Sequence, residues 1–281
     1  MPEKTQNVSF LVLGGSGRLG RLLRAVWRGR APRAGPALFQ ARSGGVGIIW
    51  APGQPMTPLP PARTVVALWG VTAGDAPALA GNSGLAEISR SVARHCGADR
   101  VFHFSSAAVY GPAEDATEDT PPAPSSPYGA AKLAMERRVA GFDDPGTAHC
   151  CLRLANVVGA DSLAPALRGG GPVRLDQFGD GTGPLRAYIG AGGLARVLDA
   201  LAALSVPDLP PVLNIALPGP LGMEDLARAA GKTVLWQRPP AHAVQRVTLN
   251  TQRLQRLLPG LEIRKTATEL IAEWAALESR E

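Results

Sequence analysis

The stretch from Val8 to Arg28 restricts the fold more than any other part of the chain. Val8 to Leu13 is apolar on both faces, which predicts a buried parallel strand. Gly14, Gly17 and Gly20 follow directly, and the run from Arg21 to Arg28 predicts a helix. In this order the first glycine makes a tight turn, the second lets the backbone approach a pyrophosphate, and the third lets helix and strand pack. The stretch therefore predicts a dinucleotide site, with a plain tight turn as the alternative.

The following residues continue the alternation of strands and helices that builds a parallel sheet. Apolar runs predict strands at 37–41, 46–50, 64–69, 101–104 and 149–154. Periodic apolar positions predict helices at 82–96 and 128–139. Prolines crowd 52–61, so we expect no crossover helix there. The pattern predicts an α/β fold, a Rossmann-type doubly wound parallel sheet.

The character of the chain changes after residue 160, where glycine-rich loops become frequent. Short helices are expected at 194–204, 223–230 and 266–277, and strands at 212–216 and 247–249. We predict a dinucleotide-binding catalytic domain at 1–160 and a smaller substrate-binding lobe at 161–281. No sharp linker separates the two, so we expect them to be intertwined.

Tyr128 and Lys132 stand four residues apart at the head of a predicted helix and therefore share one face. A phenol has a pKa near ~10, and an adjacent ammonium lowers that pKa. Ser106, at the end of the strand that begins at Val101, would hold a carbonyl or alcohol oxygen against the phenol. We therefore predict an acid/base site made of Ser106, Tyr128 and Lys132.

The end of the second strand bears on the choice of cofactor. An acidic residue there would accept hydrogen bonds from the adenosine ribose, but none is present. Arg42 would instead pair with a 2′-phosphate, or it is a solvated loop residue. The predicted cofactor is NAD(P), with NADP favoured. Its predicted site consists of Gly14, Gly17, Arg18, Leu19, Gly20, Arg42, Trp69, Gly70, Tyr128 and Lys132.

Composition narrows the remaining possibilities. The net charge of +6 comes mostly from scattered arginines, for which solvated faces are a simpler explanation than nucleic-acid binding. The three cysteines, Cys96, Cys150 and Cys151, predict buried free thiols in a reducing cytosol. Histidines and cysteines lack metal-ligand spacing, and no apolar run reaches membrane-spanning length. We expect a cytoplasmic protein without a metal, a nucleic-acid partner or a membrane partner.

Collected in this way, the residues resemble the extended short-chain dehydrogenase/reductases, specifically the NAD-dependent epimerase/dehydratase family acting on nucleotide sugars. The resemblance covers most of the chain. It rests on the glycine turn, on SSAAVYG (105–111), EDTPP (118–122), SPYGAAK (126–132) with Glu136, RLANVVG (153–159), FGDG (178–181) and RAYI (186–189).

The resemblance implies roles for further residues. Asn82 would be a structural asparagine of the catalytic set, opening the helix before the strand at Val101. Asn156 would contact a sugar nucleotide, Arg186 would grip a substrate phosphate, and Ala107 would lie beside Ser106 in the substrate site. The chain departs from the family after Arg186, where both aspartates of the RDFIHVDD stretch are missing. Acidic residues after the second and third strands are missing too.

The resemblance implies an NAD(P)-dependent epimerase/dehydratase-type oxidoreductase with Tyr128 as acid/base. Its substrate would be a sugar nucleotide or a related alcohol or carbonyl. One alternative is an NADPH-dependent carbonyl or keto-sugar reductase. Another is a dinucleotide-binding regulator without catalysis. A homodimer is expected from the resemblance as well.

Overall fold

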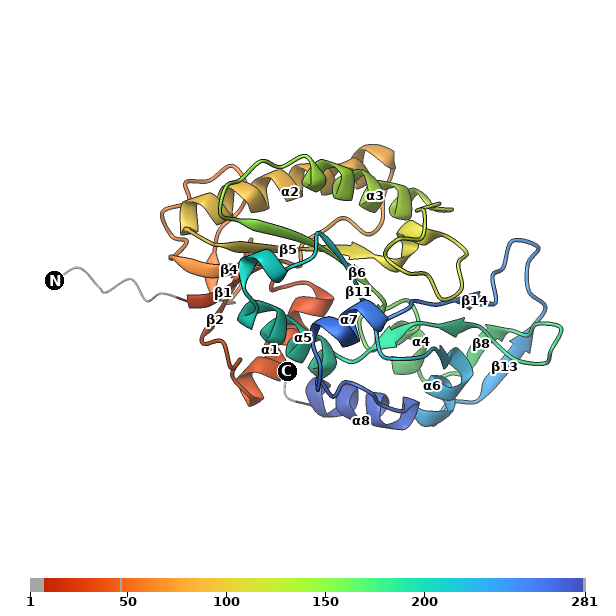
Figure 1. Cartoon of the computed structure of the whole chain (residues 1–281). Coiled ribbons are helices and arrows are strands. Elements are labelled where there is room, and N and C mark those ends of the chain that lie inside the picture. The colour runs from red at the N-terminus through yellow and green to blue at the C-terminus, as the bar shows by residue number, and fades with distance from the viewer. Residues whose placement is uncertain (1–7, 46, 280–281) are drawn as a thin grey trace.

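The computed structural model describes residues 8–45 and 47–279, and a sheet of seven parallel strands forms its centre (Figure 1). The strand order is β11-β6-β5-β4-β1-β2-β3. The strands are β1 (Val8–Leu13), β2 (Ala37–Ala41), β3 (Ile48–Ile49), β4 (Ala62–Ala67), β5 (Arg100–Ser106), β6 (Ala148–Leu154) and β11 (Val212–Ile215). The order reverses at β1, which pairs with both β2 and β4. The expected Rossmann-type α/β fold is confirmed.

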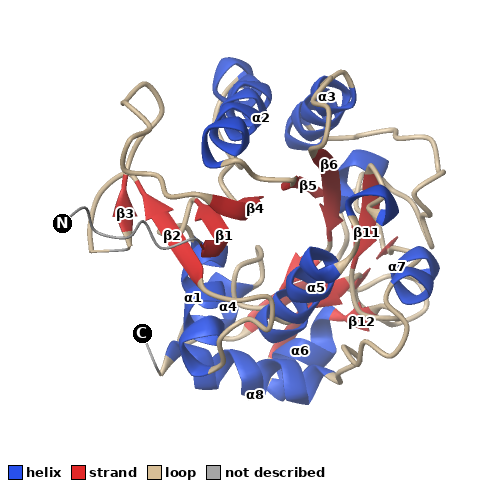
Figure 2. Cartoon of the chain, turned by 60° about the vertical axis from the view of Figure 1, so that its left-hand side comes forward, coloured by secondary structure: helices blue, strands red, loops and turns tan. Residues whose placement is uncertain are grey.

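Helices cover both faces of this sheet (Figure 2). The helices α2 (Ala76–Cys96) and α3 (Pro127–Ala140) lie on one face. The other face carries α1 (Arg18–Gly29) and α5 (Ala191–Ala203), with α8 (Ala267–Glu278) packed beyond α1.

The strand β1 shows why its residues are apolar on both faces. Phe10 and Val12 belong to the hydrophobic cluster under α1 and α5. Leu11 and Leu13 belong to a second cluster that includes Val92 of α2. All four side chains have no solvent exposure, as a strand covered by helices on both faces requires.

The residues after 160 form short elements around the helices α4 (Ala164–Arg168), α6 (Met223–Ala229) and α7 (Gln252–Leu257). Small sheets pair β7 (Asn156–Val157) with β10 (Tyr188–Ile189), and β8 (Val173–Asp176) with β13 (Val234–Gln237). A third joins β9 (Leu185–Arg186), β12 (Leu221–Gly222) and β14 (Arg246–Val247). Both β11 and α5 come after residue 160, yet β11 belongs to the large sheet and α5 covers one of its faces. The predicted domain boundary near residue 160 therefore stays a prediction.

Some predicted bounds were wrong. The helix expected at 82–96 begins at Ala76, because the Asp75 carboxylate accepts a hydrogen bond from the Ala78 amide (3.0 Å) and Pro77 suits the first turn. The third strand is shorter than 46–50, and Val46 lies outside the described residues. The fourth strand ends at Ala67, two residues before Trp69. The proline-rich connection between β3 and β4 contains no helix, as expected.

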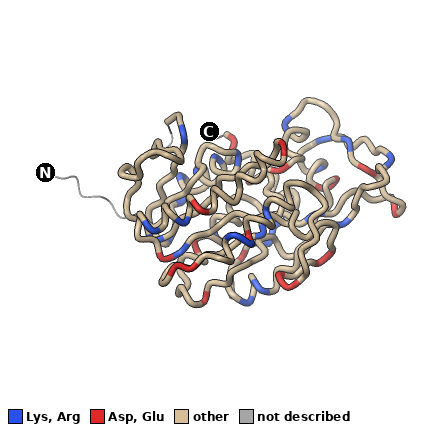
Figure 3. The backbone as a smooth tube through the Cα atoms, turned by 90° about the horizontal axis from the view of Figure 1, so that it is seen from above, with Lys and Arg blue, Asp and Glu red and all other residues tan. Residues whose placement is uncertain are grey.

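Three general expectations can be compared with the described residues. Lysines and arginines are interspersed with aspartates and glutamates along the chain in Figure 3. Within 8–45 and 47–279, no helix combines the length and the apolar composition needed to cross a membrane. Cys96, Cys150 and Cys151 are buried free thiols, as predicted.

Candidate active site

A cleft of about 1080 Å³ opens where the strand order reverses, at the carboxyl ends of the central strands. Twelve of the residues predicted for a site line this one cleft. They are Gly14, Gly17, Arg18, Leu19, Gly20, Arg42, Trp69, Gly70, Ser106, Tyr128, Lys132 and Asn156. The loops of five different strands and the start of α3 thus meet around a single space.

The glycine turn is shaped for a close backbone approach. Gly14 has a φ of +89°, and a Cβ there would lie 2.9 Å from the Trp69 amide nitrogen. A Cβ on Gly20 would lie 2.6 Å from the Gly14 carbonyl oxygen, so only glycine lets α1 pack against the turn. No side chain caps the N-terminus of α1 at Gly17. The turn and the uncapped helix end fit the pyrophosphate of a dinucleotide.

The part of the cleft beside the end of β2 is lined by Gln40, Ala41 and Arg42. Gln40, the last buried polar residue of β2, accepts a hydrogen bond from the Gly14 amide (3.0 Å) through its Oε1 and donates to the Trp50 carbonyl. Its amide group therefore links the glycine turn to Trp50, the residue that follows β3. Arg42 is exposed beside it.

The start of α3 brings Tyr128 to Ser106. The Ser126 hydroxyl caps α3 by accepting from the Gly129 amide (3.1 Å), and a Cβ on Gly129 would lie 2.3 Å from the Ala108 carbonyl oxygen. Glycine at 129 thus allows α3 to touch the short 3-10 helix that follows Ser106, η1 (Ala107–Tyr110). The Tyr128 and Ser106 side chains are hydrogen-bonded as a result.

The expected effect of Lys132 on Tyr128 was wrong for the protein without cofactor. Burial raises the pKa of Tyr128 above 10, and the hydrogen bond with Ser106 only partly offsets this. Lys132 Nζ lies 6.0 Å from the centre of the Tyr128 ring and donates to the Phe104 carbonyl (2.8 Å). Burial also lowers the pKa of Lys132 to about 8, so the amine is still mostly protonated at neutral pH. The shared helix face was correct, but the ammonium donates its hydrogen bond to the Phe104 carbonyl.

Asn82 holds the loop after β4, which lines the cleft. Its Nδ2 donates to the carbonyls of Val71 (3.0 Å) and Leu79 (2.8 Å), and its Oδ1 accepts from the Val71 amide (3.1 Å). Gly70 lies above it, and a Cβ at Gly70 would meet both Lys132 Nζ (3.0 Å) and Asn82 Oδ1 (3.1 Å). Asn82 is buried within α2, and it does not line the cleft. It is a positioning residue for the loop after β4.

A buried polar network fixes the strands behind Ser106. Arg153 and Glu136 form an ion pair (2.7 Å), and Glu136 also accepts a hydrogen bond from the Ser105 hydroxyl (2.5 Å). Arg153 donates to the Tyr110 hydroxyl (2.8 Å), which donates to Asn214 Oδ1 (2.8 Å). Asn214, on β11, had no signal in the sequence because the network partner is over a hundred residues away.

Two predicted substrate residues, Arg186 and Ala107, are not among those that line the cleft. Arg186 donates to the carbonyls of Leu185 (2.8 Å), Val244 (2.8 Å) and Gln245 (2.7 Å), and it does not line the cleft. Ala107 begins η1 and does not line the cleft either.

Asp161 is a cleft residue that the sequence did not single out. Burial raises the pKa of its carboxyl to about 6, although the Ala164 amide donates to it (3.1 Å). A carboxyl whose pKa is raised towards pH 7 is typical of a functional cleft.

Comparison with known proteins identifies relatives of this arrangement. Residues 82–174 match the model of the "NAD dependent epimerase/dehydratase family", a segment that contains Asn82, Ser106, Tyr128, Lys132 and Asn156. A UDP-glucose 4-epimerase of Azospirillum brasilense is 45% identical over 71 residues. That match spans 23% of this chain and only 20% of the relative.

Solved structures match over nearly the whole chain. MoeE5 in complex with UDP-glucose and NAD has a TM-score of 0.78 at 22% identity, covering 97% of this chain and 99% of MoeE5. The UDP-glucuronic acid 4-epimerase of Bacillus cereus, in complex with UDP-glucuronic acid and NAD, has a TM-score of 0.78 at 18% identity. The match covers 98% of this chain and 100% of the Bacillus cereus chain. At these identities the likeness shows a common fold. The family match thus confirms the resemblance to the NAD-dependent epimerase/dehydratase family over residues 82–174, and the solved structures show the fold of the chain.

Proposed function

We propose that this protein is an NAD(P)-dependent enzyme of the epimerase/dehydratase type, moving hydride between nicotinamide and a carbon of a nucleotide sugar or a related alcohol or carbonyl. One observation carries the proposal: Ser106, Tyr128 and Lys132 line the same cleft as the glycine turn. Solved structures with this fold, named for complexes of NAD with UDP-glucose or UDP-glucuronic acid, support the substrate class.

Each of the three side chains has a separate task. When bound, the dinucleotide would supply the hydride donor and acceptor. Tyr128 Oη gives or takes the proton of the substrate oxygen, and Ser106 Oγ orients that oxygen by a hydrogen bond. Lys132, anchored on the Phe104 carbonyl, places its positive charge at the cleft wall between β5 and α3. Asn156, which lines the same cleft, is proposed to contact the substrate.

Replacement of the phenol oxygen tests the proposal. Tyr128→Phe should lower kcat by roughly 10²–10⁴-fold, because the proton donor is lost while the ring still fills its place. Cofactor affinity, measured by titration calorimetry, should stay within about twofold because the glycine turn is intact. Ser125→Ala, an exposed serine three residues away, is the matched control and should keep full activity. If Tyr128→Phe retained most of the activity, Tyr128 would not be the acid/base.

Preference for NADP is a separate proposal. The adenosine end of the cleft carries Gln40 and exposed Arg42 and no carboxylate. The similar solved structures are named as complexes with NAD, so the comparison gives no support to NADP. We expect NADP to bind about tenfold more tightly than NAD, and Arg42→Gln to remove that difference without weakening NAD. Arg28→Gln, exposed on α1 outside the cleft, is the control. Tighter binding of NAD would refute the preference.

A simple NADPH-dependent reductase is the second candidate, because Arg186, the residue expected to grip a substrate phosphate, is held on backbone carbonyls. A reductase consumes NADPH in proportion to product, whereas an epimerase regenerates its cofactor in each turnover. Cofactor binding without turnover of any substrate would instead favour a regulator. The cytoplasmic location and the homodimer remain predictions beside this proposal.

A further inference from the structure

A second hollow, of about 510 Å³, shares no lining residue with the cleft. It lies between the end of α1, the loop that follows α1, the helix α5 and the loop that precedes α8; Figure 2 shows these helices together on one side of the sheet. We call it the α1–α5 groove. Its volume falls within the range of small-molecule sites.

Three arginines line the α1–α5 groove, Arg30, Arg33 and Arg196. None of their side chains has a hydrogen bond or ion pair with the described residues, and Arg196 Nε is buried without a partner. A buried guanidinium donor without an acceptor is costly, and a bound acceptor would remove that cost.

Two carboxylates, Asp199 and Glu262, line the groove as well, so its five charged side chains leave a net positive charge, and neither carboxylate forms an ion pair with the three arginines. Asp199 accepts hydrogen bonds from the backbone amides of Arg33 and Ala34, both at 2.8 Å. It therefore holds the loop after α1 onto α5. Glu262 is exposed at the rim. The groove is thus left with three unpaired guanidinium groups and an ordered wall.

The rest of the lining is apolar, from Val26, Pro32 and Leu261 and from alanines of α5. A ligand that fits both parts carries an apolar body and an anionic head. A phosphate monoester offers three terminal oxygens, one for each guanidinium, and guanidinium forks match phosphate geometry. A carboxylate offers only two.

We propose that the α1–α5 groove binds a small phosphate monoester with an apolar body, its phosphate held by Arg30, Arg33 and Arg196. This site is separate from the proposed active site. Its test does not depend on the catalytic proposal, because binding is measured without cofactor or substrate.

The test uses phenyl phosphate as the probe, titrated into the full chain by calorimetry. We expect a dissociation constant of about 1 mM or below, with inorganic phosphate and phenol each binding more weakly. Arg196→Gln should weaken phenyl phosphate about tenfold or more, and Arg33→Gln, at an exposed position, should also weaken it. Arg28→Gln is the matched control and should change the constant by less than about twofold.

Several outcomes would overturn the proposal. One is a dissociation constant for phenyl phosphate above about 10 mM, which is weaker than the binding expected of a genuine ligand site of this size. Equal binding of hexanoate would contradict the phosphate class. Loss of binding in Arg18→Gln, with Arg196→Gln unaffected, would place the anion at the glycine turn instead. Thermal melting of each variant verifies folding, and Arg33→Gln decides the question if Arg196→Gln does not fold.

Discussion

At the scale of single residues, sequence spacing predicts which side chains share a helix face, but it does not predict their burial or their pKa. A four-residue interval places Tyr128 and Lys132 on one helix face, and the structure agrees. The pKa of Tyr128 depends on burial, which spacing does not reveal, so the expected lowering was wrong. The partner of Tyr128 is Ser106, because Gly129 lets α3 approach η1 closely. Gln40 and Asp161 were missed because neither belongs to a motif.

The raised pKa of Tyr128 leads to a spectroscopic prediction. The chain has three tyrosines, and burial raises the pKa of all three, Tyr110, Tyr128 and Tyr188. Without cofactor we expect no tyrosinate absorbance below about pH 10. An oxidised dinucleotide brings a positive charge into the cleft, so one tyrosinate should then form at lower pH. Tyr128→Phe should abolish that signal; an unchanged signal would mean that another tyrosine titrates.

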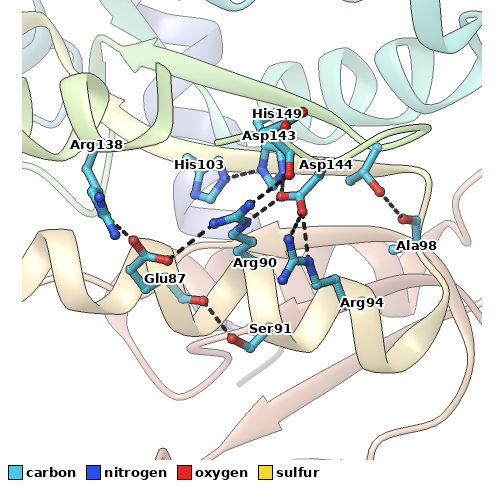
Figure 4. Close-up of polar contacts among 11 residues, drawn as sticks. Glu87, Arg90, Ser91, Arg94, Ala98, His103, Arg138, Asp143, Asp144 and His149 are labelled. Atoms are coloured by element: carbon cyan, nitrogen blue, oxygen red, sulfur yellow. Dashed lines mark hydrogen bonds and ion pairs between the residues drawn. The ribbon is translucent and has the colours of Figure 1, made fainter. Parts of the chain in front are cut away.

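Among the elements, α2 and α3 hold the site from one face of the sheet. Asn82 of α2 fixes the loop after β4, and α3 carries both Tyr128 and Lys132. The two helices are joined at the outside by a polar network (Figure 4). Arg90 and Arg94 of α2 bind Asp144, Arg90 at 2.6 Å. The sequence predicted both helices but not these contacts, because residues 50 or more positions apart meet only after folding.

Two histidines continue this network into the sheet. His149 Nε2 contacts Asp144 (3.0 Å), and its Nδ1 lies 3.0 Å from His103 Nε2. His103 has 1% of its surface exposed. Burial, together with the charges of His149 and Lys132, lowers the pKa of His103 to about 3. His103 is thus a neutral core histidine, in agreement with its position inside an apolar strand.

The depressed pKa of His103 predicts a pH dependence of stability. Between about pH 6.5 and pH 3 the unfolded chain binds a proton at His103 that the folded chain does not. The free energy of unfolding should therefore fall by about 1.4 kcal/mol per pH unit from this group as the pH decreases. Urea unfolding of His103→Asn across this range should show a slope smaller by about one proton. His95→Asn, at an exposed position of α2, is the matched histidine replacement that serves as control. Equal slopes for His103→Asn and the parent would contradict the assignment.

At the scale of the whole molecule, the two predicted parts share one core. A single hydrophobic cluster runs from Phe10 of β1 through Leu198 of α5 to Trp274 of α8. Arg100, fully buried at the start of β5, donates to the carbonyls of Ala202 (2.6 Å) and Leu204 (2.8 Å) at the end of α5. The parallel, doubly wound sheet could be predicted from the alternation of strands and helices. The return of β11 to the sheet could not, because a short apolar run does not show which neighbour it will pair with.

This shared core predicts that the chain unfolds in one transition. Trp27 lies before residue 160 and Trp274 after it, and both belong to the same cluster. Urea unfolding followed by tryptophan fluorescence and by far-ultraviolet circular dichroism should give one midpoint. Leu198→Ala should lower the free energy of unfolding by about 2–5 kcal/mol and shift both signals together, because it opens a cavity in that core.

The control for this prediction is Leu235→Ala on β13, a leucine that is 38% exposed and outside the cluster. We expect it to change the free energy of unfolding by less than about 1 kcal/mol. Hydrogen exchange gives an independent measurement, since amides of β11 and β6 should open with the same free energy if they belong to one unit. Two separate midpoints, or β11 exchanging well before β6, would show that residues 161–281 fold as a unit of their own. The fold would then consist of two docked domains, and Arg100 would hold an interface between them.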